Sequence, residues 1–186
     1  MVGSLGLFIV ALSFSGPSLP SQQAGVWLDV PFVRQQGNGC GAASLAMVLQ
    51  YWQFQQHLTM EPAADPGEIL RALYSRAAGG IYASDMERYL QRQGFRTFAF
   101  RGEWSDLREQ LEKGRPLIVA LKAERAQLHY VVVAGLDWQQ DVVLKNDPAQ
   151  RKLLKQERSE FEKEWKAAGN WTLLAVPREE ERTPSR

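Results

Sequence analysis

The spacing of hydrophobic residues changes along the chain, from a helical pattern to a strand-like pattern near residue 94. Between residues 42 and 54, Leu45, Val48, Leu49 and Trp52 recur at intervals of three and four. This spacing places them on one face of a helix. Small or apolar residues fill neighbouring positions of the same segment. The pattern therefore predicts a largely buried helix.

Three shorter helices are predicted next, from residues that commonly begin and end helices. Asp65-Pro66-Gly67-Glu68, Ser84-Asp85-Met86-Glu87 and Ser105 each precede apolar residues at helical spacing. Such residues cap helix N-termini. Gly94 and Gly114 follow the second and third segments, where glycine typically ends a helix.

Strand patterns dominate the rest of the chain. The expected strands span residues 95–100, 117–121, 130–136, 142–145 and 171–176. A further helix is expected over residues 159–168, opened by a capping box of Ser159 and Glu162. Residues 26–33 contain Pro31, which favours an extended edge segment. Helices followed by strands, without regular alternation, indicate the α+β class.

Composition narrows the class of protein. The chain has 186 residues, 45% of them hydrophobic, and a formal net charge of +1, which predicts one domain with an ordinary core. A balanced charge attracts neither nucleic acid nor an anionic membrane, so we expect neither as a partner. One cysteine and two histidines exclude an internal disulfide and argue against a zinc site.

The ends of the chain differ in composition from its middle. Residues 5–14 form an apolar run that is short for a membrane span and typical of the core of a signal peptide. Ser13 and Ser15 suggest cleavage before Gly16, although the first basic residue is Arg34. We therefore predict a signal peptide and linker over 1–25, one domain over 26–177 and a polar tail over 178–186. The prediction implies export to the periplasm or the extracellular space, with an uncleaved tether as the alternative.

Cys40 lies where a glycine-rich loop is expected to enter the first helix. Unpaired backbone N–H groups at a helix N-terminus favour thiolate over thiol. A lone cysteine is otherwise a small buried hydrophobe. The position makes Cys40 a candidate nucleophile.

A thiol nucleophile needs a base that titrates near neutral pH, which imidazole provides. His129 opens the most apolar strand, whereas His57 lies in a polar connection and is interpreted as a solvated residue. Asp147 follows the next strand, and a hairpin would bring it beside His129 to orient the ring. Asn146 could share that role, and Asp137, at the far end of the hairpin, is the weaker alternative.

Acyl transfer also requires donors for a developing oxyanion. The Cys40 backbone N–H and a glutamine amide from the preceding loop could supply them. Gln35 is the preferred candidate, and Gln36 remains open.

These segments together resemble a known family. Their order is Val30-Pro31-Phe32-Val33-Arg34-Gln35, Cys40-Gly41-Ala42-Ala43, His129-Tyr130 and Asp147-Pro148. The pattern is similar to C39-family cysteine peptidases. The resemblance implies a papain-like fold, with an N-terminal helical part packed on a C-terminal antiparallel sheet. It also implies a nucleophile at Cys40, a base at His129, an orienting Asp147 and an oxyanion glutamine at Gln35.

The chain also departs from the best-known members of that family. Those relatives carry membrane transport and ATP-binding domains and cleave leader peptides after paired glycines. No phosphate-loop motif occurs here, and Gly39 stands where they often have an acidic residue. We therefore predict a monomeric thiol-dependent peptidase without metal or organic cofactor, acting on a peptide or protein. A transglutaminase-like acyltransferase and a catalytically silent peptide-binding module are the alternatives.

Overall fold

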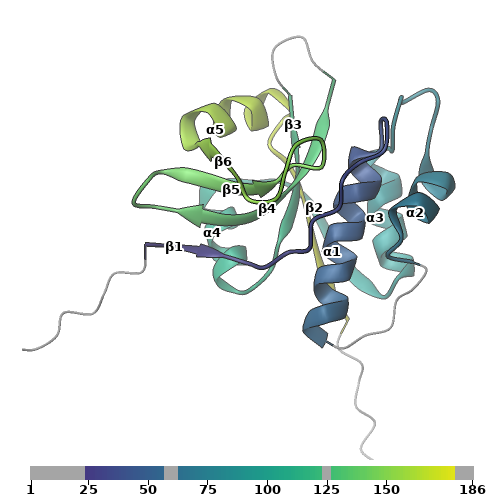
Figure 1. Cartoon of the computed structure of the whole chain (residues 1–186), viewed down its shortest axis with the longest axis horizontal. Helices are drawn as coiled ribbons and strands as arrows, with labels where there is room; N and C mark the ends of the chain where they lie inside the picture. Colours follow the sequence, from purple (N-terminus) through teal and green to yellow (C-terminus); the bar gives the residue numbers. More distant parts are fainter. Residues whose placement is uncertain (1–23, 57–62, 123–126, 179–186) are drawn as a thin grey trace, which may run out of the picture.

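A computed structural model describes residues 24–56, 63–122 and 127–178. These residues form a sheet with helices packed on both of its faces (Figure 1). The helices are α1 (Cys40–Gln56), α2 (Pro66–Leu73), α3 (Ala83–Arg92), α4 (Trp104–Glu112) and α5 (Arg158–Ala167). The strands are β1 (Gly25–Trp27), β2 (Phe95–Arg101), β3 (Leu117–Leu121), β4 (His129–Asp137), β5 (Val142–Asn146), β6 (Leu154–Glu157) and β7 (Trp171–Pro177).

The sheet is antiparallel throughout. Its order is β2-β7-β3-β4-β5-β6, and β1 pairs with β4 outside this path. The long strand β4 pairs with β3, β5 and β1. The prediction of an α+β fold with N-terminal helices packed on a C-terminal antiparallel sheet is confirmed.

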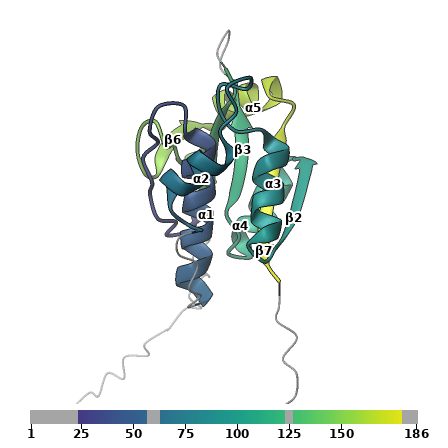
Figure 2. The ribbon, with the colours of Figure 1, turned by 90° about the vertical axis from the view of Figure 1, so that its right-hand side faces the viewer.

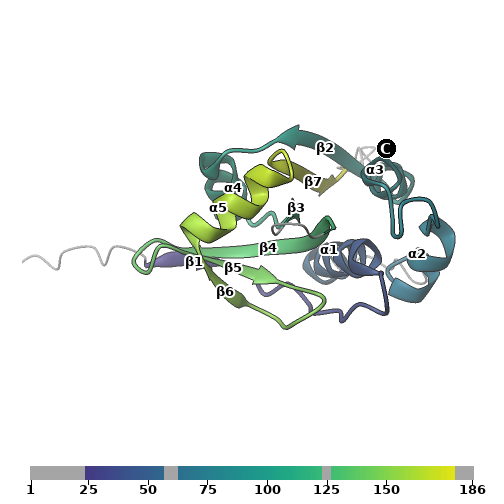
Figure 3. The ribbon, with the colours of Figure 1, turned by 90° about the horizontal axis from the view of Figure 1, so that it is seen from above.

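Helix α1 is the centre of the helical part. Every residue from Gly41 to Leu49 is buried, so this part of the helix is enclosed on all sides rather than along one face. Seen from the side and from above, α1 lies against the sheet, with α2 on its outer side and α3 beside β2 (Figures 2 and 3). This burial immobilises the end of the helix that carries Cys40.

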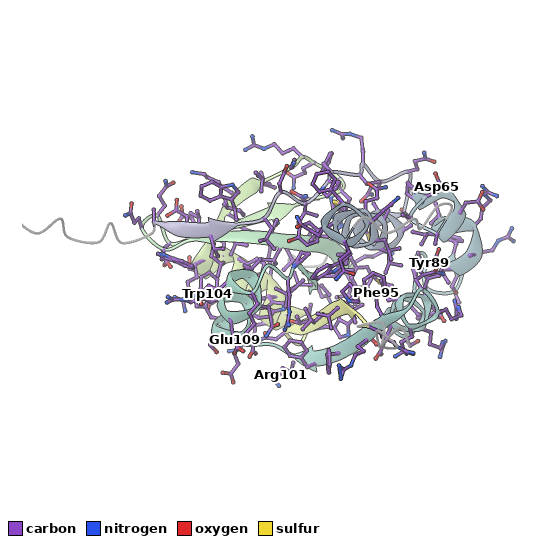
Figure 4. The ribbon with its side chains drawn as sticks, turned by 90° about the horizontal axis from the view of Figure 1, so that it is seen from below. Asp65, Tyr89, Phe95, Arg101, Trp104 and Glu109 are labelled. Carbon is purple, nitrogen blue, oxygen red and sulfur yellow. The ribbon has the colours of Figure 1, made fainter. Side chains whose placement is uncertain are left out.

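Alternation along the central strands gives the sheet two apolar faces. On one face, Ile118, Ala120 and Val132 pack in the core shared with α1, α2 and α3. On the other, Val119 and Val131 belong to the core covered by α4 and α5. The view from below places Asp65 and Tyr89 at the helical end and Trp104 and Glu109 at the opposite end (Figure 4). The strands that cross between the two cores are therefore held from both sides.

The capping residues predicted for the shorter helices are confirmed at one helix and displaced at the others. The Asp65 carboxylate accepts a hydrogen bond of 2.8 Å from the Glu68 N–H, as expected for an N-cap. The predicted start at Ser84 is wrong, because α3 already begins at Ala83 without a side-chain cap. The helix predicted from Ser105 begins at Trp104, after Glu103, whose N–H donates to the Asp106 carboxylate.

Two expectations for the C-terminal half need correction. The capping box predicted at Ser159 is absent, because α5 begins one residue earlier and its N-cap, Glu157, makes no side-chain cap. The short strand β6 was not predicted. Its residues alternate between half-buried and exposed, and its pairing to β5 depends on backbone hydrogen bonds more than on a hydrophobic pattern.

Several predictions lie outside the described residues. They are the signal peptide and most of the linker, His57, and the tail beyond residue 178. Within the part of the chain that the structure describes, no helix combines the length and hydrophobicity needed to cross a membrane.

Candidate active site

Cys40 is the first residue of α1 and follows a tight turn. The Gly39 N–H donates to the Gln36 carbonyl over 3.0 Å, and the Gly39 carbonyl accepts the Ala43 N–H over 2.9 Å. A Cβ at position 39 would lie 2.8 Å from the Gln36 carbonyl oxygen, so the turn accommodates glycine and no larger residue without a shift. The turn places the thiol at the helix N-terminus, as the sequence predicted.

His129 is the first residue of β4 and lies opposite Leu121 of β3. The Cys40 sulfur lies near the His129 imidazole and the backbone N–H groups of Tyr130 and Gly41, which lower the pKa of its thiol. Packing of α1 against β4 thus brings together two residues that are 89 positions apart in the chain. The imidazole is 30% exposed, so it remains accessible from solvent.

Asp147 follows the last residue of β5 and is 2% exposed. Its Oδ1 lies 2.8 Å from His129 Nε2 and also accepts the Ala149 N–H at 3.0 Å. Its Oδ2 accepts from Gln150 Nε2 at 3.0 Å and lies 3.8 Å from Lys145 Nζ. These contacts fix the carboxylate. Nε2 of the imidazole carries the hydrogen that is donated to Asp147. The other ring nitrogen, Nδ1, is then the one that can exchange a proton with the Cys40 sulfur.

The alternative orienting residues are engaged elsewhere. The Asn146 amide donates to the Val30 carbonyl at 3.1 Å and accepts the Leu153 N–H at 2.9 Å. Asp137 accepts two backbone N–H groups of the β4–β5 turn. Asn146 therefore ties the segment before the active-site loop to the sheet, and Asp137 shapes a turn at the other end of β4.

Gln35 and Gln36 differ in burial, which separates two candidates that the sequence left open. Gln35 is half-buried and Gln36 is exposed. The Gln35 amide Nε2 donates to the Gly37 carbonyl at 2.7 Å, and its backbone N–H donates to the Pro148 carbonyl at 3.0 Å. Gln35 is thereby attached to both the Cys40 loop and the Asp147 turn. Its role at an oxyanion stays a prediction.

Burial and hydrogen bonding shift the pKa values of Cys40, His129 and Asp147 in opposite directions. Burial raises the pKa of the Cys40 thiol, but the hydrogen bonds from His129 and the Tyr130 N–H outweigh it and leave this pKa below its usual value. Burial lowers the pKa of His129, but hydrogen bonds to Asp147 and Cys40 raise it to about 9. Both shifts favour the thiolate–imidazolium pair over the neutral thiol and imidazole.

The carboxylate completes this charge arrangement. Burial raises the pKa of Asp147, but the hydrogen bond from His129 and the charges of His129 and Lys145 hold this pKa below its ordinary value. Burial lowers the pKa of Lys145, opposed by Asp147 and Glu164. Sequence reasoning did not single out Lys145. The available signal was a lysine in an otherwise apolar strand, which indicates either an exposed position or a buried ion pair.

The residues present show no preformed metal site. Within the described residues, no group of three or more histidine, cysteine or acidic side chains is arranged to hold a metal ion. The arrangement of thiol, imidazole and carboxylate instead suits acyl transfer through sulfur.

Comparison with solved structures supports the fold. A protein from Bacillus anthracis, assigned as a C39-like peptidase, superposes with a TM-score of 0.62 at 22% identity, covering 85% of this chain and all of the other. The peptidase domain of Streptococcus ComA, a bifunctional ABC transporter involved in quorum sensing, gives a TM-score of 0.61 at 21% identity, covering 79% and 97%.

A third similar structure is a double glycine motif protease from an AMS/PCAT transporter, solved in complex with its leader peptide. Its TM-score is 0.61 at 23% identity, and the match covers 84% of this chain and all of that protein. Among curated proteins, none matches this chain. The family model described as Peptidase_C39 like family matches residues 27–173. The chain therefore belongs to the C39-like peptidase family and has its papain-like fold.

Proposed function

We propose that the protein is a cysteine peptidase in which Cys40 is the nucleophile, His129 the acid and base, and Asp147 the residue that orients the imidazole. The observation that carries this proposal is the placement of His129 beside the Cys40 sulfur, with its Nε2 bonded to Asp147 Oδ1 at 2.8 Å. Family membership and the fold support it independently. The leader peptide bound to one similar protease supports a peptide as the substrate.

The proposed reaction proceeds in two steps. Cys40 Sγ attacks the peptide carbonyl carbon, and the resulting oxyanion accepts the Cys40 backbone N–H and an amide hydrogen of Gln35. The Gln35 amide has two hydrogens, so its bond to Gly37 leaves one for this role. The imidazolium protonates the leaving amine as the C–N bond breaks, giving an acyl-thioester. Water, deprotonated by His129, then releases the acid and the thiol.

The test is peptide turnover by Cys40→Ala and Cys40→Ser, with peptides first found by a library screen on the unmodified protein. Both variants should lose turnover. Ser44→Ala is the matched control, because Ser44 is fully buried in the same helix and lies outside the proposed chemistry. Turnover that survives in both Cys40 variants would refute the proposal.

The same screen separates hydrolysis from the alternatives. Mass spectrometry with an added primary amine should show hydrolysed peptides. Amine-linked products would indicate acyl transfer. Failure of thiol-directed peptide analogues to label Cys40 would indicate a binding module.

We also propose export, for which the apolar run at residues 5–14 is the support. Expression of the full chain followed by cell fractionation and N-terminal sequencing tests it. A mature protein beginning near Gly16 outside the cytoplasm is expected. Cytoplasmic protein that retains residue 1 would contradict the proposal.

A further inference from the structure

A polar cavity of about 320 Å³ lies beside the imidazole of His129. The ends of several strands and α5 surround it, and its lining includes His129, Lys145 and Asp147 but not Cys40. His129 therefore borders this space and also lies beside the Cys40 sulfur, which is not part of the lining. The cavity volume is in the range that protein ligands occupy.

This inference rests on the proposed function, because the proposed reaction indicates which part of the substrate would lie beside the cavity. The acyl half of the substrate becomes attached to the Cys40 sulfur. The amine half receives its proton from His129 and must therefore lie against the imidazole. A residue that follows the scissile bond would then direct its side chain into the space beyond His129.

The cavity lining carries charges of both signs. Lys145 contributes an ammonium group and His129 an imidazolium, opposed by the carboxylates of Asp147 and Glu164, whereas the ammonium of Lys155 is bonded to Gln140 Oε1 at 2.9 Å. A ligand anion must therefore be recognised by a particular cation rather than by an excess of positive charge. The Asp147 oxygens are already occupied by His129, Ala149 and Gln150, so Asp147 has little capacity for a further donor.

Lys145 has donor capacity to spare. It is only 4% exposed, and an ammonium so deeply buried normally has close hydrogen-bonding partners. Among the described residues, its one carboxylate within 4 Å is Asp147, at 3.8 Å. That distance exceeds the ordinary 2.7–2.9 Å or so of an ammonium–carboxylate hydrogen bond. A ligand carboxylate in the cavity would provide a closer partner.

We propose that this cavity binds the acidic side chain of the residue that follows the scissile bond, with Lys145 as the residue that selects it. Aspartate or glutamate at that substrate position would accept hydrogen bonds from the Lys145 ammonium. The uncharged amides asparagine and glutamine have nearly the same shapes and lack the charge, so they serve as matched controls.

The experiment compares kcat/KM for peptide pairs that differ only by Glu against Gln, or Asp against Asn, after the scissile bond. The acidic member should be cleaved about tenfold faster, as a charge-assisted hydrogen bond is stronger than a neutral one. In Lys145→Gln and Lys145→Met this ratio should fall to near one. Because the ratio is taken within one enzyme, damage to the catalytic groups cancels.

Lys152→Gln is the control for the lost charge. Lys152 pairs with Asp29 at 2.5 Å and lies outside the cavity lining, so this variant should keep the preference. Retention of the preference in a folded Lys145→Gln or Lys145→Met protein would overturn the proposal. So would a ratio near one in the unmodified enzyme.

A binding measurement distinguishes failure here from failure of the proposed chemistry. Cys40→Ala cannot form the thioester, yet its cavity is intact. Calorimetry should show that N-acetyl-Glu-Ala-amide binds Cys40→Ala more tightly than N-acetyl-Gln-Ala-amide does, and that adding Lys145→Met removes the difference. Equal binding overturns the assignment of the cavity. Cys40-independent turnover overturns the peptidase mechanism instead.

Discussion

Replacing Asp147 by Asn removes the negative charge beside His129 while preserving the shape of the side chain. The Asn carbonyl oxygen can still accept a hydrogen bond from His129 Nε2, which lies 2.8 Å from Asp147 Oδ1, whereas the Asn amide NH2 replaces the Oδ2 that accepts from Gln150. The substitution therefore tests the contribution of the carboxylate charge to stabilisation of the imidazolium. If the carboxylate supports the imidazolium, activity should fall and its pH dependence should move.

The expected size follows from the pKa of His129. Burial lowers this pKa, yet hydrogen bonds to Asp147 and Cys40 bring it to about 9, against an ordinary value of 6.5. At about 1.4 kcal/mol per pKa unit, the whole rise corresponds to about 3 kcal/mol. Because the side chain is 30% exposed and Cys40 contributes, we assign about 1–2 kcal/mol to Asp147. This corresponds to a roughly five- to thirtyfold lower kcat/KM.

The assay is kcat/KM for a cleaved peptide measured from about pH 5 to pH 10. The alkaline limb reports loss of the imidazolium, so it should move to lower pH, by about one unit, in Asp147→Asn. Asp137→Asn makes the same change in the β4–β5 turn and should leave the profile in place. A folded Asp147→Asn protein with an unchanged profile would refute this account of the imidazolium.

Three further predictions follow from the same site. Alkylation of Cys40 should show a thiol pKa below the ordinary value. His129→Ala should raise this pKa, because the variant lacks the imidazole that lowers it. Equal alkylation profiles for the two proteins would contradict this prediction. Folding raises the pKa of His129 from 6.5 to about 9. Protonated His129 therefore stabilises the folded state fully below pH 6.5, and this stabilisation is lost as the pH rises through about 9. Urea unfolding should show the decline in the free energy of unfolding for the unmodified protein and not for His129→Ala. Gly39→Ala places a Cβ 2.8 Å from the Gln36 carbonyl oxygen and should lower the free energy of unfolding by about 1–3 kcal/mol. Gly80→Ala is the control and should lower it less, because the nearest atom to its Cβ is 3.7 Å away. The reverse order of the two variants in urea unfolding would disprove the packing argument.

Local features of the fold were predictable wherever a few neighbouring residues decide them. The run of apolar residues after Cys40 predicts α1, and Asp65 predicts the start of α2 through a hydrogen bond within one helical turn. The same reasoning failed at Ser159, where α5 begins without a side-chain cap. It also missed β6, which has a weak hydrophobic pattern and is held by its pairing with β5.

The residues of the candidate site were predictable from the sequence, but their contacts were not. A thiol at a helix N-terminus, a histidine at the mouth of an apolar strand and an aspartate after the next strand are all visible in the sequence. Their meeting depends on antiparallel register, which pairs Leu121 with His129 and β5 with β4. The burial of Lys145 beside Asp147 is likewise a product of that pairing.

The sequence by itself determined most of the helices and strands, though not β6, and where reactive side chains stand within them, because those properties arise from neighbouring residues. Only the tertiary structure decided which of these side chains share a site, how the pKa values of Cys40 and His129 shift, and that Lys145 faces a cavity. Distances between residues far apart in the chain are set by strand pairing and core packing, and a residue's neighbours in sequence do not specify them.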